Sequence, residues 1–218
     1  MNTTALIMID MEQMYLQQDL RDRYGWPAIW EFDRVLSSCV ELAQAAREAG
    51  IPVIYTRQVE REDGADTMPV YRRLKDKAKS EFGETQDMSP SGEASQIIDV
   101  IAPKPGDIVI EKLRWDAFFN TPLDNILRNL GATRIIIAGL QTNVCVETTA
   151  RSGLMRNYEV GIAEDAVSTD GKSLHFAALE AMKVLYAEVL PWKDLIDTEQ
   201  EWNHGISTPH YGRIDNDR

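Results

Sequence analysis

The stretch TRIIIAGLQTNVCVETTARSG, residues 133–153, joins a run of large apolar residues to a segment of helical character, and a lone cysteine lies at the junction. An uninterrupted apolar run is typical of a strand that is buried on both faces of a parallel sheet. Thr142 and Asn143 are residue types that favour the N-cap of a helix. The stretch therefore predicts a strand, a turn and a helix, with Cys145 in the first helical turn.

The same alternation of short apolar runs and helical periods extends in both directions along the chain. Further strands are predicted at residues 4–10, 52–56, 107–112, 158–166 and 188–190, with helical segments between most of them. Because right-handed crossovers place such helices on both faces of one parallel sheet, the pattern predicts an α/β fold. We expect a three-layer α/β/α arrangement with a six-stranded parallel sheet, which is Rossmann-like.

The composition favours a single cytoplasmic domain. Of the 218 residues, 44% are hydrophobic, which is enough for one substantial core. The formal net charge is −12, and the sequence lacks the basic patch that a protein needs to bind nucleic acid or an anionic membrane. The first residues have no basic signal region, and no apolar run approaches the roughly 18 residues of a membrane span. We therefore expect a small-molecule substrate, and neither a nucleic-acid nor a membrane partner.

The two cysteines, Cys39 and Cys145, are too few for a disulfide scaffold, and no Cys/His cluster has metal-ligand spacing. We expect free thiols, no metal and no cofactor. Cys39 falls in the middle of a predicted helix, on its apolar face, where a small buried residue is the simplest interpretation.

Two segments depart from the alternation. Residues 58–92 are polar, charged and weakly periodic, and they predict a long surface segment with room for a short helix, which is either disordered or a lid-like insertion. Residues 191–218 are polar but include Trp192, Trp202 and Tyr211, and such a segment cannot form its own core. We place one domain at residues 1–190 and a C-terminal tail at 191–218, which either wraps a neighbouring subunit or is disordered.

Three reactive side chains fall at the carboxyl ends of predicted strands, where open parallel sheets bind ligands. Asp10 ends the first strand, Lys112 ends the third, and Cys145 follows the fourth. The helix N-terminus favours a thiolate at Cys145, which is a competent nucleophile. A carboxylate can move the thiol proton to a leaving amine, and an ammonium can stabilise developing negative charge. Taken alone, Asp10 is better interpreted as a turn cap and Lys112 as a solvated lysine, and Cys145 is equally well a buried apolar residue. The catalytic interpretation depends on their combination.

Histidines are the alternative bases. His175 falls too late in its helical unit to reach the strand ends easily, and His204 and His210 lie in the polar tail. We therefore favour Asp10 as the base. Asp165, at the end of the fifth predicted strand, is either a supporting residue of the site or a turn former.

Four motifs carry a resemblance to a known family: MID ending at Asp10, EKLRWDAFFNTPLDNIL with Lys112, IIIAGLQTNVCVETTA with Cys145, and YEVGIAEDAVS. Over roughly residues 4–190, the chain resembles the isochorismatase-like cysteine hydrolases. That superfamily contains nicotinamidases, N-carbamoylsarcosine amidases, biuret hydrolases and ureidoacrylate amidohydrolases. The resemblance implies a catalytic triad of Asp10, Lys112 and Cys145 and a thioester acyl-enzyme.

The resemblance also implies a cis peptide between Leu140 and Gln141. It would turn the backbone amides of Gln141 and Cys145 toward the substrate oxygen, as an oxyanion hole. The family further implies a homo-oligomer, a dimer or a tetramer.

Within this family, the sequence favours one branch. Metal-dependent nicotinamidases carry histidines after the second strand, but YTRQVEREDGAD has none, and Cys145 favours C–N hydrolysis over vinyl-ether cleavage. We expect a metal-independent cysteine amidohydrolase for a small ureido, carbamoyl or amide substrate, with a ureidoacrylate-like compound favoured. An isochorismatase-type vinyl-ether hydrolase and a non-catalytic metabolite-binding or redox-sensing member remain alternatives.

Substrate contacts are expected from cationic, amide and aromatic residues near the strand ends, because a small polar acid needs an anchor and an apolar wall. The candidates are Arg57, Gln58, Arg114, Trp115, Phe118 and Phe119. Gln141 stands where ureidoacrylate amidohydrolases usually have a small residue, so its amide either enters the pocket or points away.

Overall fold

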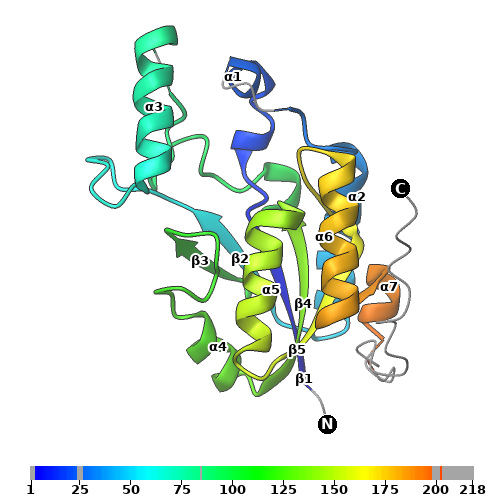
Figure 1. Ribbon diagram of the computed structural model, residues 1–218. Coiled ribbons are helices and arrows are strands. Elements are labelled where there is room, and N and C mark those ends of the chain that lie inside the picture. Colours follow the sequence, from blue (N-terminus) through cyan, green and yellow to red (C-terminus); the bar gives the residue numbers. More distant parts are fainter. Residues whose placement is uncertain (1–2, 24–26, 84, 198–201, 203–218) are drawn as a thin grey trace.

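Six parallel strands in the order β3-β2-β1-β4-β5-β6 form the centre of the computed structural model (Figure 1). It describes residues 3–23, 27–83, 85–197 and 202. The strands are β1 (Thr3–Ile9), β2 (Val53–Gln58), β3 (Ile108–Lys112), β4 (Ala132–Leu140), β5 (Glu159–Ser168) and β6 (Glu188–Leu190). The helices are α1 (Gln18–Arg23), α2 (Phe32–Glu48), α3 (Pro69–Phe82), α4 (Leu123–Asn129), α5 (Glu147–Leu154), α6 (Lys172–Leu185) and α7 (Trp192–Leu195). The predicted three-layer fold is confirmed.

Helices cover both faces of the sheet. Buried side chains of α4, α5 and α6 share one core cluster, and those of α2 and α7 share the other. β1 lies at the centre and contributes to both: Ile7 and Ile9 face the first cluster, and Leu6 and Met8 face the second. Each such side chain contributes about 1.5–3 kcal/mol by leaving water, so the two clusters fix the positions of the strand ends.

The carboxyl ends of β1 and β4 approach each other very closely. Gly139 has a φ of 102°, and a Cβ at this position would lie 2.1 Å from the carbonyl oxygen of Ile9. Only glycine allows this approach, which sets the residues that follow the two strands side by side.

The turn after β4 differs from the prediction. Residues Thr142–Val146 form a π-helical turn, and the regular helix α5 begins only at Glu147. Cys145 therefore lies inside a widened turn and precedes the first turn of α5. Single π-helical turns of this kind are frequent at functional sites.

The insertion contains a helix, and the tail differs in part from the prediction. Residues 58–92 contain a helix of 14 residues, α3, which stands with α1 beyond the carboxyl ends of the strands (Figure 1). The core does not end at residue 190, because Trp192, Leu195 and Trp202 are buried against α2 and β5 residues of the same chain. The apolar aromatic side chains thus find their partners within the domain. Tyr211 lies outside the described residues.

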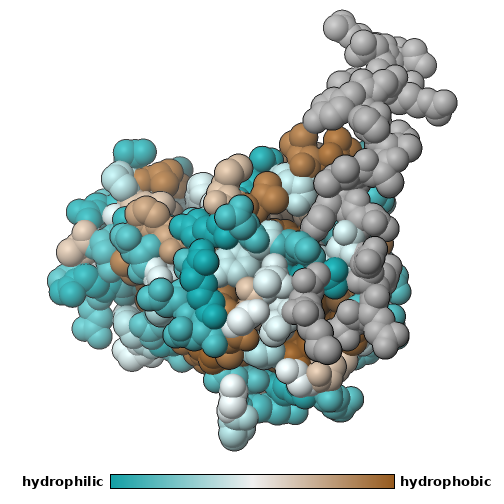
Figure 2. Space-filling view, turned by 90° about the horizontal axis from the view of Figure 1, so that it is seen from below, coloured by the Kyte–Doolittle hydropathy of each residue, from teal (hydrophilic) through white to brown (hydrophobic). Residues whose placement is uncertain are grey.

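Seen from below, the surface shows hydrophilic residues around smaller hydrophobic patches (Figure 2). None of the helices in the described part of the chain is long and apolar enough to cross a membrane.

Candidate active site

Asp10, Lys112 and Cys145 meet at the carboxyl edge of the sheet. The Lys112 Nζ lies 2.6 Å from Asp10 Oδ2 and 3.6 Å from Cys145 Sγ. All three are buried, with exposed fractions of 1%, 1% and 5%. An acid, an ammonium and a thiol therefore form one contiguous cluster that is shielded from bulk water.

The elements of the sheet hold each of these groups in place. Asp10 follows β1 with a φ of 47°, and its Oδ1 accepts a hydrogen bond of 2.7 Å from the hydroxyl of Thr56 on β2. Lys112 is the last residue of β3, and its Nζ also donates to the carbonyl oxygen of Arg114 at 3.0 Å. The strand order β3-β2-β1-β4 therefore explains how residues far apart in the sequence meet.

The protonation of Cys145 differs from the sequence-based expectation of a thiolate. Burial raises the pKa of the Cys145 thiol well above its ordinary value; Lys112 opposes this rise and Asp10 adds to it. Desolvation is the largest of these effects, so burial favours the thiol form of Cys145. A thiol needs a base before it can act as a nucleophile, and the carboxyl group of Asp10 belongs to the same cluster.

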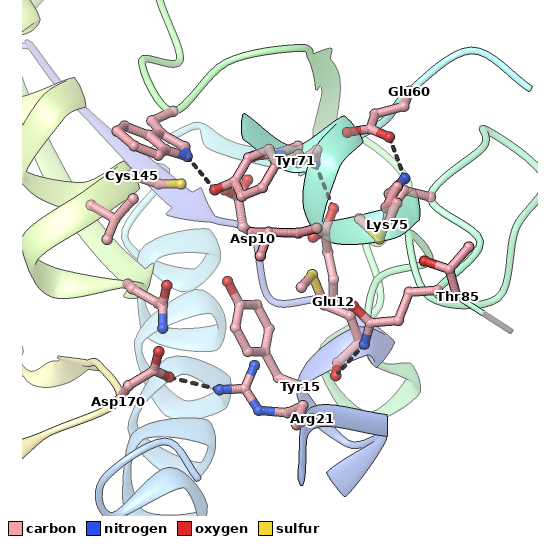
Figure 3. Close-up of a pocket in the computed structure, with 18 residues that line it drawn as sticks. Asp10, Glu12, Tyr15, Arg21, Glu60, Tyr71, Lys75, Thr85, Cys145 and Asp170 are labelled. Carbon is pink, nitrogen blue, oxygen red and sulfur yellow. Dashed lines mark hydrogen bonds and ion pairs between the residues drawn. The ribbon is translucent and has the colours of Figure 1, made fainter. Parts of the chain in front are cut away.

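The cluster opens into a cavity of about 210 Å³ (Figure 3). Its wall is built from the segment after β1 together with α1, the end of β2, α3 with the residues around it, the segment after β3, the turn after β4, and the connection from β5 to α6. The lining residues are Asp10, Glu12, Met14, Tyr15, Arg21, Gln58, Glu60, Tyr71, Leu74, Lys75, Thr85, Gln86, Met88, Trp115, Gln141, Val144, Cys145 and Asp170.

Of the six predicted substrate contacts, the structure places Gln58 and Trp115 at the cavity. The indole N–H of Trp115 donates to the hydroxyl of Tyr71 on α3 at 2.8 Å, so the insertion is tied to the rim of the site. Gln141 also lines the cavity, and the peptide between Leu140 and Gln141 is cis.

The other four candidates do not line the cavity. Arg57 pairs with Glu111, and Arg114 donates to the carbonyl oxygen of Asp66 at 3.1 Å. Phe118 is buried in the core, where its ring stacks on that of Tyr158, and Phe119 is 49% exposed to solvent. Residue type and closeness to the ends of β2 and β3 predicted these contacts, but the four side chains form other contacts or face solvent.

Several lining residues escaped the sequence-based prediction because distant segments bring them together. Arg21 of α1 forms an ion pair of 2.6 Å with Asp170, which precedes α6. Tyr71 and Lys75 come from α3. The only sequence signal was the unusual length of the polar insertion, which indicates a segment with a role at a site but not its contacts.

Asp165 does not lie at the rim. β5 continues to Ser168, and Asp165 Oδ1 accepts the backbone N–H of Trp192 at 2.8 Å, which holds the start of α7. The predicted strand ended at residue 166, two residues before the end of β5, because it was defined by the apolar run in the sequence.

His175 lies closer to the site than predicted. α6 begins at Lys172, so His175 is in its first turn, and its Nδ1 is 2.9 Å from Thr142 Oγ1 in the turn that carries Cys145. Burial, aided by the charge of Arg34, lowers the pKa of His175 from 6.5 to about 4. A neutral imidazole therefore contacts the turn that carries Cys145 at neutral pH.

This histidine predicts a pH-dependent stability. As the pH falls from 6.5 to about 4, His175 binds a proton in the unfolded chain but stays neutral in the folded protein. The free energy of unfolding therefore decreases. In the variant His175→Asn this component is absent. The stability advantage of the wild type over the variant should shrink across that window in urea titrations, and a constant difference would contradict the assignment.

Among the described residues, no group of three or more His, Cys, Asp and Glu side chains is arranged to hold a metal ion.

Comparison with known proteins agrees with this architecture. A family model described as the isochorismatase domain matches residues 4–194. The ureidoacrylate amidohydrolase RutB of Methylobacterium radiotolerans is 34% identical over 196 residues, which cover 86% of this chain and 76% of that protein. RutB of an Enterobacter species is 30% identical over 223 residues, and the match covers 97% of this chain and 92% of that protein. The crystal structure of a cysteine hydrolase from Pseudomonas syringae pv. phaseolicola is similar with a TM-score of 0.76 at 26% identity, covering 88% of this chain and 90% of that one.

Proposed function

The chain belongs to the isochorismatase domain family, and on this basis we propose that it is a metal-independent cysteine amidohydrolase that cleaves a C–N bond of a small substrate. The observation that supports this most directly is the buried cluster at the cavity floor. There Lys112 contacts the carboxylate of Asp10 at 2.6 Å and the thiol of Cys145 at 3.6 Å.

The geometry supports a two-step acyl transfer. Asp10 takes the thiol proton as Cys145 Sγ bonds to the substrate carbonyl carbon, and it gives that proton to the departing nitrogen as the C–N bond breaks. A water molecule, deprotonated by Asp10, then cleaves the thioester and regenerates the thiol. Lys112 balances the negative charge of the cluster throughout, and the backbone amides of Gln141 and Cys145 are the proposed donors to the oxyanion.

We propose a ureido, carbamoyl or amide compound as the substrate, with a ureidoacrylate-like molecule favoured. Both RutB relatives are named as ureidoacrylate amidohydrolases. The cavity of about 210 Å³ suits a small molecule, and its wall combines the rings of Trp115 and Tyr71 with polar groups.

The test is ammonia release from ureidoacrylate, biuret, an N-carbamoyl amino acid, maleamate and nicotinamide, with wild type beside Cys145→Ser. Ammonia from one compound, lost in the variant, is the expected result and identifies the substrate branch. Ammonia release that persists in Cys145→Ser, or none from any compound, would contradict the proposal.

Trp115 should contribute to substrate binding more than to chemistry. The variant Trp115→Ala removes an aromatic wall and the tether to Tyr71, so we expect KM to rise about tenfold with a smaller change in kcat. The control is Phe119→Ala, which removes an exposed ring outside the cavity and should leave KM unchanged. Equal effects of the two variants would contradict a binding role for Trp115.

We also propose that the chain forms a homo-oligomer, a dimer or a tetramer. α6 presents Leu174, Phe176, Val184 and Leu185 to solvent, each about half exposed, and apolar residues gathered on one helix are typical of a subunit contact. Light scattering coupled to gel filtration measures the mass, and a monomer at micromolar concentration would contradict the proposal.

A further inference from the structure

Glu12 is a second acid at the Asp10–Lys112 pair that the proposed mechanism does not use. It is completely buried and lines the same cavity (Figure 3). Its Oε1 accepts the backbone N–H of Gln58 at 2.5 Å, whereas Oε2 has no hydrogen-bond partner among the residues that the structure describes.

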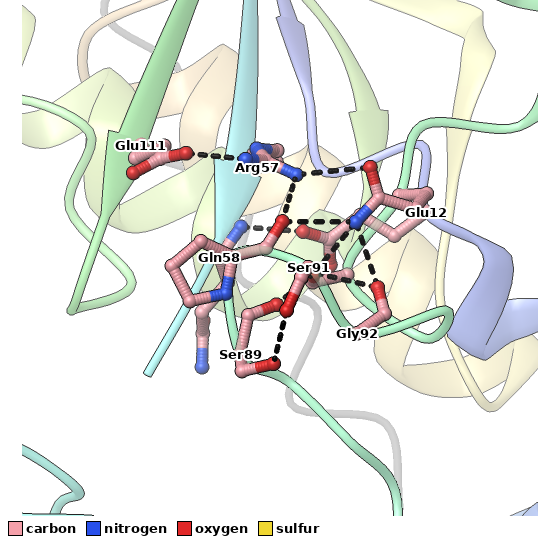
Figure 4. A network of polar contacts seen from close by, with 10 residues as sticks. Glu12, Arg57, Gln58, Ser89, Ser91, Gly92 and Glu111 are labelled. Atoms are coloured by element: carbon pink, nitrogen blue, oxygen red, sulfur yellow. Dashed lines mark hydrogen bonds and ion pairs between the residues drawn. The ribbon is translucent and has the colours of Figure 1, made fainter. Parts of the chain in front are cut away.

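The surrounding backbone holds Glu12 in place. Its N–H donates to the carbonyl oxygen of Asp10 at 2.9 Å, and it pairs with Ile97 in an isolated antiparallel bridge. Arg57 and Gln96 extend this network to the carbonyl oxygen of Pro90 (Figure 4). Arg57 also pairs with Glu111, so its charge is already compensated by a carboxylate.

The charges of this cluster do not balance if every acid is ionised. Two carboxylates, Asp10 and Glu12, lie near one ammonium, Lys112, and all three groups are buried. A net charge out of water is costly, so such a cluster takes up a proton instead. Asp10 receives the contact of Lys112 and the hydroxyl of Thr56, whereas Oε2 of Glu12 has no hydrogen-bond partner among the described residues.

We propose that Glu12 is a positioning residue that works as a neutral carboxylic acid, with its proton on Oε2, and so leaves Asp10 as the carboxylate that pairs with Lys112. Oε1 is the carbonyl oxygen, because it accepts the Gln58 N–H. The catalytic part of this inference rests on the proposed function, whereas the protonation of Glu12 does not.

The titration of Glu12 has the direction that this assignment requires. Burial first and the charge of Asp10 second raise the pKa of Glu12 well above its ordinary 4.5, while Lys112, the Gln58 N–H and Arg57 oppose the rise. The other ionisable groups that sense its charge are Tyr15 and Cys145. When the pH exceeds the raised pKa of Glu12 and this residue ionises, a new negative charge near Cys145 disfavours the thiolate, and turnover should decline.

The decisive variant is Glu12→Gln, which retains the shape, the acceptor for Gln58 and a donor in place of Oε2–H. We expect the kcat/KM of this variant at neutral pH to lie within about threefold of wild type. The decline of its turnover with rising pH should be absent or moved to higher pH. The matched control is Glu60→Gln, which removes a cavity carboxylate that pairs with Lys75 and should keep the decline. A folded Glu12→Gln that loses turnover at neutral pH about 100-fold, or keeps the wild-type decline, would overturn the proposal.

A stability measurement tests the protonation without any substrate. The pKa of Glu12 is raised in the folded state. Its contribution to the free energy of unfolding therefore decreases as the pH rises above 4.5 toward the folded pKa. The Tm of Glu12→Gln relative to wild type should therefore increase with pH, and a constant difference would overturn the assignment. If this increase is seen but no panel compound is hydrolysed, the proposed function fails and the neutral acid stands. If Glu12→Gln does not fold, infrared spectroscopy of the wild type replaces it and should detect a protonated carboxylic acid above pH 4.5. Absence of that signal would overturn the assignment.

Discussion

Replacing Cys145 by alanine should reduce turnover at least about 10⁴-fold while the protein stays folded, because the attacking atom is removed and no other group can form the acyl-enzyme. The side chain is small and lies at the wall of a cavity, so its truncation creates little new void. The measurements are kcat/KM on the substrate found in the panel and a thermal denaturation scan.

The other cysteine supplies the matched control. Cys39 is buried in α2, and its Sγ lies 3.2 Å from the carbonyl oxygen of Ala166, away from the cavity. Cys39→Ala should keep its activity and lose some stability, because a packed core position is emptied. Activity that survives in Cys145→Ala would refute covalent catalysis at this residue, and equal losses in both variants would indicate a general effect of thiol removal.

The central part of the site was predictable from the sequence because it depends only on strand ends. Continuous apolar runs mark buried parallel strands, and the carboxyl ends of such strands meet at one edge. Asp10, Lys112 and Cys145 each follow or end such a run, so their meeting required only the correct strand order.

The cavity wall was not predictable in the same way. Arg21 reaches the site through its pair with Asp170, and Glu12 through pairing with Ile97; neither contact leaves a periodic signal in the sequence. His175 was judged too late in its helical unit to reach the strand ends, and its contact with Thr142 depends on how α6 lies against the turn after β4. Local pattern therefore locates the reactive edge, whereas long-range contacts select the residues around it.

The raised pKa of the thiol illustrates the same limit in energetic terms. The helix N-terminus near Cys145 is visible in the sequence, and it alone favours a thiolate. Burial acts in the opposite direction and is the larger effect. Its size depends on how completely distant segments close over the sulfur, which no local pattern contains.

Replacing Lys112 by methionine should be the most costly single change to the fold of the site. Methionine has a similar length but no charge, so the buried carboxylate of Asp10 loses its 2.6 Å partner. Removing one partner of a buried pair typically costs about 3–5 kcal/mol of stability. Loss of the charge that stabilises the transition state should lower kcat/KM by a further factor of about 10²–10³ in the molecules that remain folded. Urea denaturation and steady-state kinetics measure the two effects.

The double variant Lys112→Met with Asp10→Asn separates stability from catalysis. With no charge left on either partner, the desolvation cost disappears and the free energy of unfolding should recover much of its loss, since the two residues are coupled. Activity should not recover, because the base is now absent as well. Stability that stays as low as in Lys112→Met would show that the lysine acts by packing alone. Activity restored together with stability would mean that the Asp10–Lys112 pair supports the fold and takes no part in proton transfer.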